Sequence, residues 1–264
     1  MNILVFDIET IPNTDLGRSL YNLHDLDDDD VAKVMFFKQR QEKQNEFLPL
    51  YLHKVVAISI LLKKSDDSGD EIEVISLGTD AFDEKGMVKQ FFDGIKYYKA
   101  NLISWNGKGF DLPVLFLRAI EHQIQAKYFW QGDQSREFGF NNYSNRYHER
   151  HLDVMDILSG YQPSLRTSLD HFSGLIGMPG KLGIDGSKVW STFLNGAYDE
   201  IRNYCDTDVI NTYISYLRFQ HFRGHISDDQ LTQEIKQLKD YLGRSSKDHL
   251  NNFLDVWNSH NNNA

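Results

Sequence analysis

The chain has 264 residues, of which 41 % are hydrophobic and 13 % aromatic, enough for a globular core in one large or two small domains. A formal net charge of −10 argues against a broad basic face that coats duplex DNA, but not against an enzyme that holds a strand end. The absence of a basic-then-apolar leader or an apolar run near the roughly 20 residues of a membrane helix, together with a single cysteine, predicts a soluble cytoplasmic protein without membrane contact.

The first predicted strand is Ile3–Phe6, a short continuous apolar run typical of a buried strand. Two acids, Asp7 and Glu9, follow it directly. The character of the sequence then changes over residues 16–50, where Val31–Phe47 has a helical pattern. We interpret this block as an insertion between the first two strands.

The next predicted feature is a β-hairpin. His53–Lys64 is rich in β-branched residues and predicts a strand. Ser65–Asp70 is typical of a turn, and Glu71–Gly78 alternates apolar and polar residues. The two strands are therefore expected to pair antiparallel.

Helices and short strands alternate through the rest of the chain. In order, the spacing predicts a helix over Lys85–Lys99, a strand over Leu102–Trp105, a helix over Leu112–His122, a long loop over 127–150, a strand beginning at His151, and helices over Thr167–Ile176, Ser187–Leu194 and Tyr198–Phe222. Without a repeat or a Pro/Gly linker, we expect one domain over 1–222 and a helical C-terminal extension over 223–264, with disorder from Ser259 onward.

Asp7 and Glu9 are the first candidate functional residues. Residues i and i+2 of a strand point to the same face, so these two carboxylates can converge on one cation. Carboxylate oxygens suit Mg²⁺ or Mn²⁺. The structural alternative, in which Asp7 only caps the strand or accepts from a backbone amide, is the commoner one for an isolated Asp-x-Glu.

Two further acidic motifs follow. In SWNGKGFDLPVL, a strand ends at Trp105, a turn begins at Asn106, and Asp111 opens a helix, where an acid is ordinary because of the helix dipole. In NYCDTDVINTYISY, Tyr204 and Asp208 lie four residues apart on one helical face. Asp206 points elsewhere and is interpreted as a solvated or capping acid. Each of these two motifs is weak by itself.

The three motifs in this order give a more specific signal. FDIET, NGKGFD and YCDTD resemble the DEDDy 3′–5′ exonucleases of the RNase H-like fold, in particular the bacterial proteins related to the proofreading exonuclease domain of family B DNA polymerases. FLPLYLHKVVAIS, HLDVMDILS and DGSKVW are also similar to that group, so the resemblance runs from about Met1 to Tyr216. Tyr204 supports the tyrosine subclass, because the histidine subclass has His where this chain has Asn203.

The resemblance implies an α/β fold with a mixed sheet, antiparallel early and parallel later, flanked by helices on both faces. It also implies a metal-dependent 3′–5′ exonuclease that removes nucleoside monophosphates from single-stranded ends, DNA more readily than RNA, with two Mg²⁺ or Mn²⁺ ions. On this basis Asp7 would bridge both ions, Glu9 and Asp208 would complete the site of the ion that activates water, and Asp111 would hold the second ion. Tyr204 would orient the nucleophile, since its ordinary pKa near 10 makes the phenol a poor base.

Contacts with the substrate are expected beside the acids. Thr10 and Ile11 would contact the terminal nucleotide, as in the family, and Asn106 would fix the turn or contact the strand. Phe110 would pack behind the site or stack on a base, and packing is favoured. Seven basic residues are candidates for a local phosphate-binding rim, although most such residues are simply solvated: Lys108, Arg118, Arg146, Arg150, Arg166, Lys181 and Lys188.

Two other functions remain open from the sequence. FDIETI superficially resembles the first motif of haloacid dehalogenase-like phosphatases, although the second acid here is Glu9. The fold could also belong to a catalytically silent nucleic-acid-binding module. The presence of all four acids and Tyr204 argues against such a loss of activity.

Overall fold

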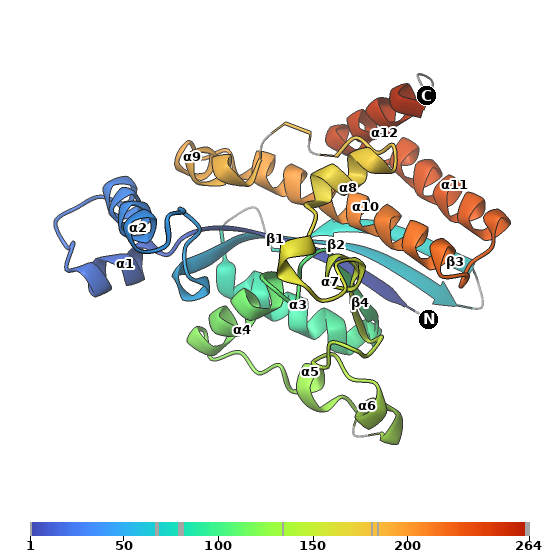
Figure 1. Cartoon of the computed structure of the whole chain (residues 1–264), viewed down its shortest axis with the longest axis horizontal. Helices are drawn as coiled ribbons and strands as arrows, with labels where there is room; N and C mark the ends of the chain where they lie inside the picture. Colours follow the sequence, from blue (N-terminus) through green and yellow to red (C-terminus); the bar gives the residue numbers. More distant parts are fainter. Residues whose placement is uncertain are drawn as a thin grey trace.

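A single mixed sheet of five strands organises the fold, in the order β3-β2-β1-β4-β5 (Figure 1). The structure is a computed structural model, and it describes residues 2–66, 69–78, 82–133, 135–180, 182–183 and 185–261. The strands are β1 (Ile3–Pro12), β2 (His53–Asp66), β3 (Gly69–Ser76), β4 (Asn101–Ser104) and β5 (His151–Asp153). The pairs β1–β2 and β2–β3 are antiparallel, whereas β1–β4 and β4–β5 are parallel. This topology confirms the predicted mixed sheet and the predicted hairpin.

The sequence predicts a first strand that ends with the acid pair, but β1 continues to Pro12. Asp7 is paired with Ser59 and Glu9 with Ala57 of β2, and the register shifts directly after Glu9. The apolar run ends at Phe6 because the next residues on the α10 side of the sheet are acids rather than apolar side chains. The acids therefore lie inside a paired strand, where the backbone holds them rigidly.

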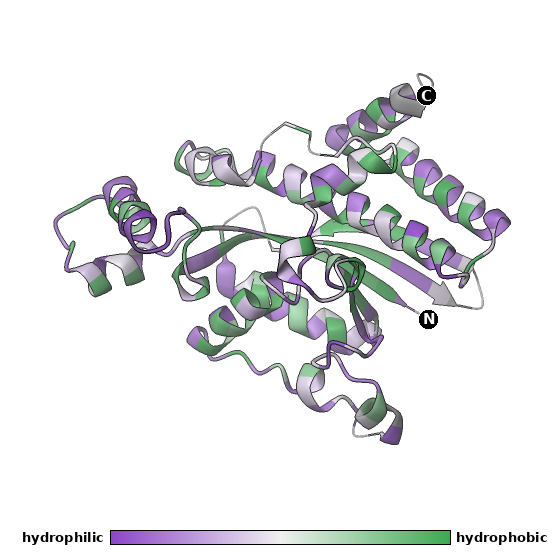
Figure 2. Ribbon diagram, in the orientation of Figure 1, coloured by the Kyte–Doolittle hydropathy of each residue, from purple (hydrophilic) through white to green (hydrophobic). Residues whose placement is uncertain are grey.

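Helices cover both faces of the sheet, as predicted (Figures 1 and 2). Leu4, Phe6 and Ile8 of β1 pack in the cluster of the first face, and Val5 packs in the cluster of the second. The first face carries α3 (Glu84–Tyr98), α4 (Asp111–Glu121) and α5 (Lys127–Gln131), and the second carries α7 (Val154–Leu158), α8 (Leu169–Leu175), α10 (Tyr198–Phe222), α11 (Asp228–Arg244) and α12 (Asp248–Asn261). Alternation along β1 thus sends odd-numbered residues toward α10.

Two segments differ from their predicted structure. The predicted loop 127–150 contains α5 and α6 (Arg136–Phe140), and Phe129 and Phe138 of these helices are buried in the core cluster of the first face. The insertion contains two helices, α1 (Thr14–Tyr21) and α2 (Asp28–Lys43), and α2 ends four residues before the predicted Phe47. The insertion has its own small core, formed by Val31, Met35, Leu48 and Leu52. It projects from one end of the sheet in Figure 1.

The C-terminal extension is two helices that share the core of the domain. A capping box at Ser227 and Gln230 starts α11. Leu238 of α11 and Phe253 of α12 are fully buried in the cluster that also contains Val5. Helix α12 continues to Asn261, so the predicted disorder is wrong for residues 259–261, and residues 262–264 lie outside the described part. Among the described helices, none is both long and apolar enough for a membrane span.

A buried ion pair joins α3 and α4, two of the helices that cover the first face. The Arg118 guanidinium donates from Nη2 to Oε2 of Glu84 at 2.6 Å and from Nε to Oε1 at 2.7 Å. Both side chains are 3 % exposed. Glu84 also accepts from the Val55 amide at 2.6 Å and lies 2.8 Å from Nε2 of His122. Arg118 therefore cannot belong to a phosphate-binding rim, because its guanidinium is buried and paired with Glu84.

Candidate active site

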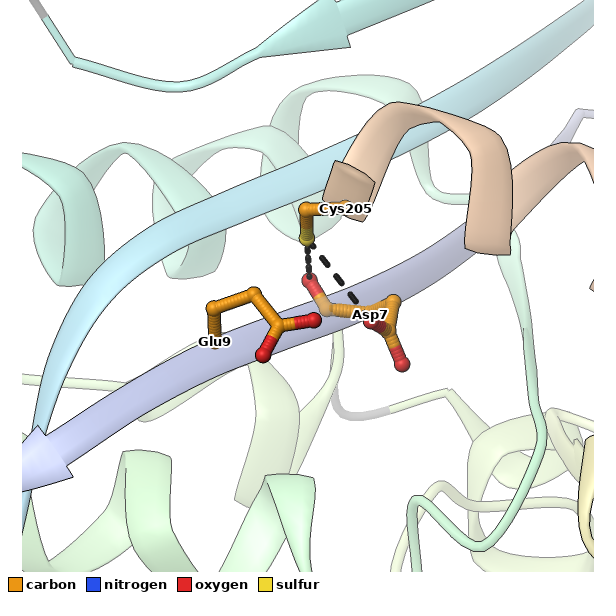
Figure 3. A group of neighbouring side chains, drawn as sticks. All are labelled: Asp7, Glu9 and Cys205. Carbon is orange, nitrogen blue, oxygen red and sulfur yellow. Dashed lines mark hydrogen bonds between the residues drawn. The ribbon is translucent and has the colours of Figure 1, made fainter. Parts of the chain in front are cut away.

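The acid pair of β1 meets helix α10. Figure 3 shows the carboxyl groups of Asp7 and Glu9 beside each other, with Cys205 reaching toward Asp7 from α10. The Cys205 thiol lies 3.4 Å from the backbone oxygen of Asp7 and 3.7 Å from its Oδ2. One ligand atom from each of the three residues lies within 4.8 Å of the others. Glu9 is buried, whereas Asp7 is partly open to solvent.

One turn of α10 supplies the tyrosine and the last acid. Tyr204 is 4 % exposed and Asp208 is 7 % exposed, and the two side chains are hydrogen-bonded. Burial raises the pKa of Tyr204, and the charges of Asp208, Glu9 and Asp7 raise it further. The phenol is therefore neutral and acts as a hydrogen-bond donor at any physiological pH.

The fourth acid, Asp111, comes from the turn between β4 and α4. Its carboxyl is hydrogen-bonded to the backbone of Ile8 and to its own backbone amide, which places it against β1. The turn is held by Asp153, whose carboxylate accepts from the amides of Asn106 at 3.0 Å and Lys108 at 2.9 Å. Asn106 adopts a positive φ of 68°, a conformation that Asn tolerates better than most residues. Asp153 thus acts as the organiser of this turn.

The five side chains predicted for the site therefore come together, and their charges affect one another. Burial raises the pKa of Asp7 well above its ordinary value, and Asp111, Asp208 and Glu9 raise it further. Burial also raises the pKa of Asp111 to about 7, with additional repulsion from Asp153 and Asp208. Carboxyl groups in this arrangement repel one another when all are ionised, and a bound cation would relieve that repulsion.

The donor set suits a hard divalent cation. Asp7, Glu9, Asp111 and Asp208 offer carboxylate oxygens, the ligands that Mg²⁺ and Mn²⁺ prefer. Cys205 was not identified from the sequence, and its position directly after Tyr204 was the only available signal. Burial raises the pKa of its thiol well above the ordinary value, so it stays protonated and donates to Asp7. The protonated thiol is therefore a hydrogen-bond donor to Asp7 and not a thiolate.

An apolar cavity of about 530 Å³ opens beside Glu9. Three of the four predicted substrate contacts, Thr10, Ile11 and Phe110, are among its lining residues, and the insertion contributes Phe36 and Phe47. Asn106 lies instead in the β4–α4 turn, where its Oδ1 is buried. The cavity is thus built jointly by β1, the insertion, α9 (Val189–Leu194) and the start of α4.

His53 lines this cavity and is hydrogen-bonded to Thr10 of β1. It was not identified as a site residue from the sequence. Its Nε2 lies 3.0 Å from the Leu48 carbonyl oxygen, which can only accept, so Nε2 carries the proton. Its Nδ1 therefore accepts from the Thr10 hydroxyl at 2.8 Å. Burial lowers the pKa of His53, which keeps the ring neutral. The ring packs edge-on against Phe110, with centroids 5.1 Å apart.

The interpretation of Asp206 as a solvated or capping acid is wrong. Asp206 is not solvated but 1 % exposed, and it accepts from Ser59, Ser76, Lys247 and His249. Burial alone would raise the pKa of Asp206, but the hydrogen bond from His249 and the charge of Lys247 lower it below the ordinary value.

Of the remaining basic residues predicted for a phosphate-binding rim, Lys181 lies outside the described residues. Lys108, Arg146 and Arg166 line one cavity together.

The raised pKa of Asp111 predicts that the metal-free protein loses stability as the pH rises. Between 3.8, the ordinary pKa, and about 7, the folded state holds a proton on Asp111 that the unfolded state has released, so unfolding becomes easier with increasing pH. Thermal unfolding in a chelator across this interval measures the effect. Carboxyls with lowered pKa, such as Asp70, act in the opposite direction, so Asp111→Asn is the reference. Equal pH slopes for the two proteins would contradict the prediction.

One family model matches most of the chain. It is described as a predicted 3′–5′ exonuclease related to the exonuclease domain of PolB, and it matches residues 45–257. The matched range contains Asp111, Tyr204 and Asp208, and begins after Asp7 and Glu9. No curated protein sequence shows a significant match to the chain.

Proposed function

Since the chain belongs to the family of predicted 3′–5′ exonucleases related to the exonuclease domain of PolB, we propose that it hydrolyses the terminal phosphodiester bond of single-stranded DNA from the 3′ end. The observation that carries this proposal is the convergence of Asp7, Glu9, Asp111 and Asp208 beside Tyr204. The mixed α/β sheet with helices on both faces is consistent with the RNase H-like exonuclease fold.

The proposed reaction replaces one phosphorus–oxygen bond by another. The oxygen of a water molecule bonds to phosphorus, the bond to the 3′ oxygen of the preceding nucleotide breaks, and a proton passes to that oxygen. The products are a nucleoside 5′-monophosphate and a strand shorter by one nucleotide. The four carboxylates would hold two divalent ions, which supply positive charge to the phosphate oxygens and make bound water more acidic.

Tyr204 is proposed to position the attacking water. Its pKa is raised, so the phenol cannot remove a proton at neutral pH. It can donate one hydrogen bond and accept another, and its hydrogen bond with Asp208 orients the ring. Cys205 and the Ile8 backbone keep Asp7 and Asp111 in place through the hydrogen bonds described above.

The apolar cavity beside Glu9 is proposed to receive the terminal nucleoside. Its walls contain Phe110, Phe47 and Trp190, and its volume of about 530 Å³ is in the range of small-ligand sites. The Thr10 hydroxyl, which donates to His53, retains acceptor capacity for the sugar. Trp190 of α9 also donates to Asp29 of α2 at 3.2 Å, and this hydrogen bond links α9 to the insertion.

The direct test is digestion of single-stranded DNA labelled at either end, with Mg²⁺ or Mn²⁺ and with chelator. Metal-dependent release of labelled mononucleotide from the 3′ end first is expected. Retention of the strand without cleavage would favour the silent binding module, and the same panel made of RNA tests the preference for DNA. Trapping of a phosphorylated aspartate would favour the phosphatase, which the family match already opposes.

Phe110→Ala is expected to raise KM for single-stranded DNA about 5- to 150-fold, because one base–aromatic stack contributes about 1–3 kcal/mol. Steady-state kinetics on a 3′-labelled strand measures this change. Phe110→Leu separates stacking from packing, since leucine fills the contact with Phe47 and His53 but offers no ring face. If Phe110→Leu behaves as wild type, the side chain packs behind the site and does not stack on a base.

A further inference from the structure

A second cavity is lined by Lys108 and Gly109 of the β4–α4 turn that precedes Asp111. It has a volume of about 540 Å³, and Lys108, Gly109, Leu112 and Pro113 contribute to its lining. Phe110, between these residues in the chain, lines the apolar cavity instead. The β4–α4 turn therefore contributes to both cavities, and Asp111 follows Phe110 directly in the chain.

The lining of this second cavity is cationic in a chain whose net charge is −10. Three basic side chains, Lys108, Arg146 and Arg166, line it, and the lining includes a single acid, Asp156. Arg146 donates from Nη2 to both oxygens of Asp156 at 2.7 Å, and Nη2 of Arg166 lies 3.5 Å from Oδ1. Asp156 is 2 % exposed, so it is a buried anchor that orients both guanidinium groups and neutralises one charge of three.

The basic groups remain accessible to a ligand. The Arg146 side chain is 42 % exposed and the Arg166 side chain 32 %. Burial lowers the pKa of Lys108, against the opposing effect of Asp153 and Asp156, so an incoming anion would be attracted by an ammonium that is already partly desolvated. Gly109 keeps the turn narrow, because a Cβ there would lie 2.4 Å from Oδ1 of Asn106 and 3.3 Å from Nη1 of Arg166.

Aromatic side chains accompany the cations. Trp130 is 55 % exposed and packs against Phe116, with ring centroids 5.1 Å apart, and both line the cavity. An exposed aromatic face beside basic groups is the combination that proteins use for single strands, where the charges track phosphates and the rings stack on bases.

We propose that this basic and aromatic cleft binds the phosphodiester and base of a nucleotide upstream of the bond that is cleaved. The single strand would then cross the acid cluster from this cleft to the apolar cavity, which takes its 3′ end. The inference rests on the proposed exonuclease function. The cleft explains how an acidic protein holds an anionic strand. Its cations lie next to the strand, whereas more distant negative charges are screened over a Debye length of about 8–10 Å.

The test compares two substrates with the variant Lys108→Gln/Arg166→Gln, which leaves Arg146 bonded to Asp156. The substrates are an oligonucleotide and the p-nitrophenyl ester of thymidine 5′-monophosphate, which has no upstream nucleotide. We expect KM for the oligonucleotide to rise at least about tenfold more than KM for the ester, and the dependence of log KM on log salt to become shallower by roughly 1–2. The control Lys85→Gln/Lys96→Gln removes two exposed charges from α3 and should change neither.

Equal losses on both substrates, or no change on either, would overturn the proposed cleft. The activity of the wild-type protein tests the exonuclease proposal separately. If wild type cleaves neither substrate, the exonuclease proposal fails. The cleft is then still tested by fluorescence anisotropy of a labelled single strand in chelator, where the double variant should bind at least about tenfold more weakly than the control.

Discussion

Asp7→Asn is expected to lower kcat/KM for 3′-labelled single-stranded DNA by at least about 10³-fold while stabilising the metal-free protein. The loss follows because Asp7 is the acid whose charge interacts with all three of the others, so its removal disrupts the proposed cation site as a whole. A divalent ion contributes several kcal/mol to the stabilisation of a transition state, and each 1.36 kcal/mol corresponds to about tenfold in rate. The gain in stability follows because the amide removes a charge that repels Glu9, Asp111 and Asp208.

The measurement pairs single-turnover cleavage with thermal unfolding in chelator. Asp255→Asn, an exposed acid on α12, is the matched control and should alter neither quantity. Tyr204→Phe should lose less activity, about ten- to a hundredfold, because it removes one orienting hydrogen bond and no proposed metal ligand. Full activity in purified Asp7→Asn would remove the basis of the exonuclease assignment. A fall in stability would show that the acids do not repel one another in the folded protein.

Arg118→Met is expected to destabilise the protein by about 3–5 kcal/mol, because it leaves the Glu84 carboxylate buried without its main cationic partner. For a protein of this size, such a loss corresponds to a fall in Tm of roughly 6–20 °C. Urea and thermal unfolding measure it. The surface pair of Arg40 and Glu46 supplies the control, since both side chains are more than half exposed. Arg40→Met should change stability by no more than about 1 kcal/mol.

The double variant Glu84→Gln/Arg118→Met separates the buried charge from lost packing. It should recover much of the stability lost in Arg118→Met, because no unpaired charge then remains between α3 and α4. If the double variant is as unstable as Arg118→Met, packing of the arginine stem is the dominant contribution. The pair also affects the site, since α4 carries Asp111 and the Val55 amide links Glu84 to β2.

The arrangement of the two cavities gives the net charge a function. The negative net charge disfavours broad adsorption to nucleic acid, whereas Lys108, Arg146 and Arg166 concentrate positive charge at one cavity. Under the proposed function, a strand end would be held locally and long stretches of duplex would not be bound. This distribution suits an enzyme that acts on ends, and it makes the salt dependence in the substrate comparison a sensitive readout.

The sequence alone was sufficient for the features that depend on local order. Asp7 and Glu9 share one face because side chains alternate along a strand, and Tyr204 and Asp208 share one because they are four apart in a helix. The hairpin of β2 and β3 followed from β-branched residues around a turn, and the mixed sheet from the resemblance. The end of β1 at Pro12 was missed, because an acid on one face of a strand interrupts the apolar run without interrupting the pairing with β2.

Only the tertiary structure decided which distant residues meet. Cys205 bonds Asp7 across 198 positions of the chain, and Asp206 accepts from Ser59 across 147, and neither contact has a local sequence signal. The same holds for Arg118, whose partner Glu84 lies on another helix, and for Lys108, Arg146 and Arg166, which become one cleft only when the turn before α4 packs near β5 and α7. Periodicity fixes the direction of a side chain relative to its own element, but packing between elements determines its neighbours, and those neighbours set its charge and its chemistry.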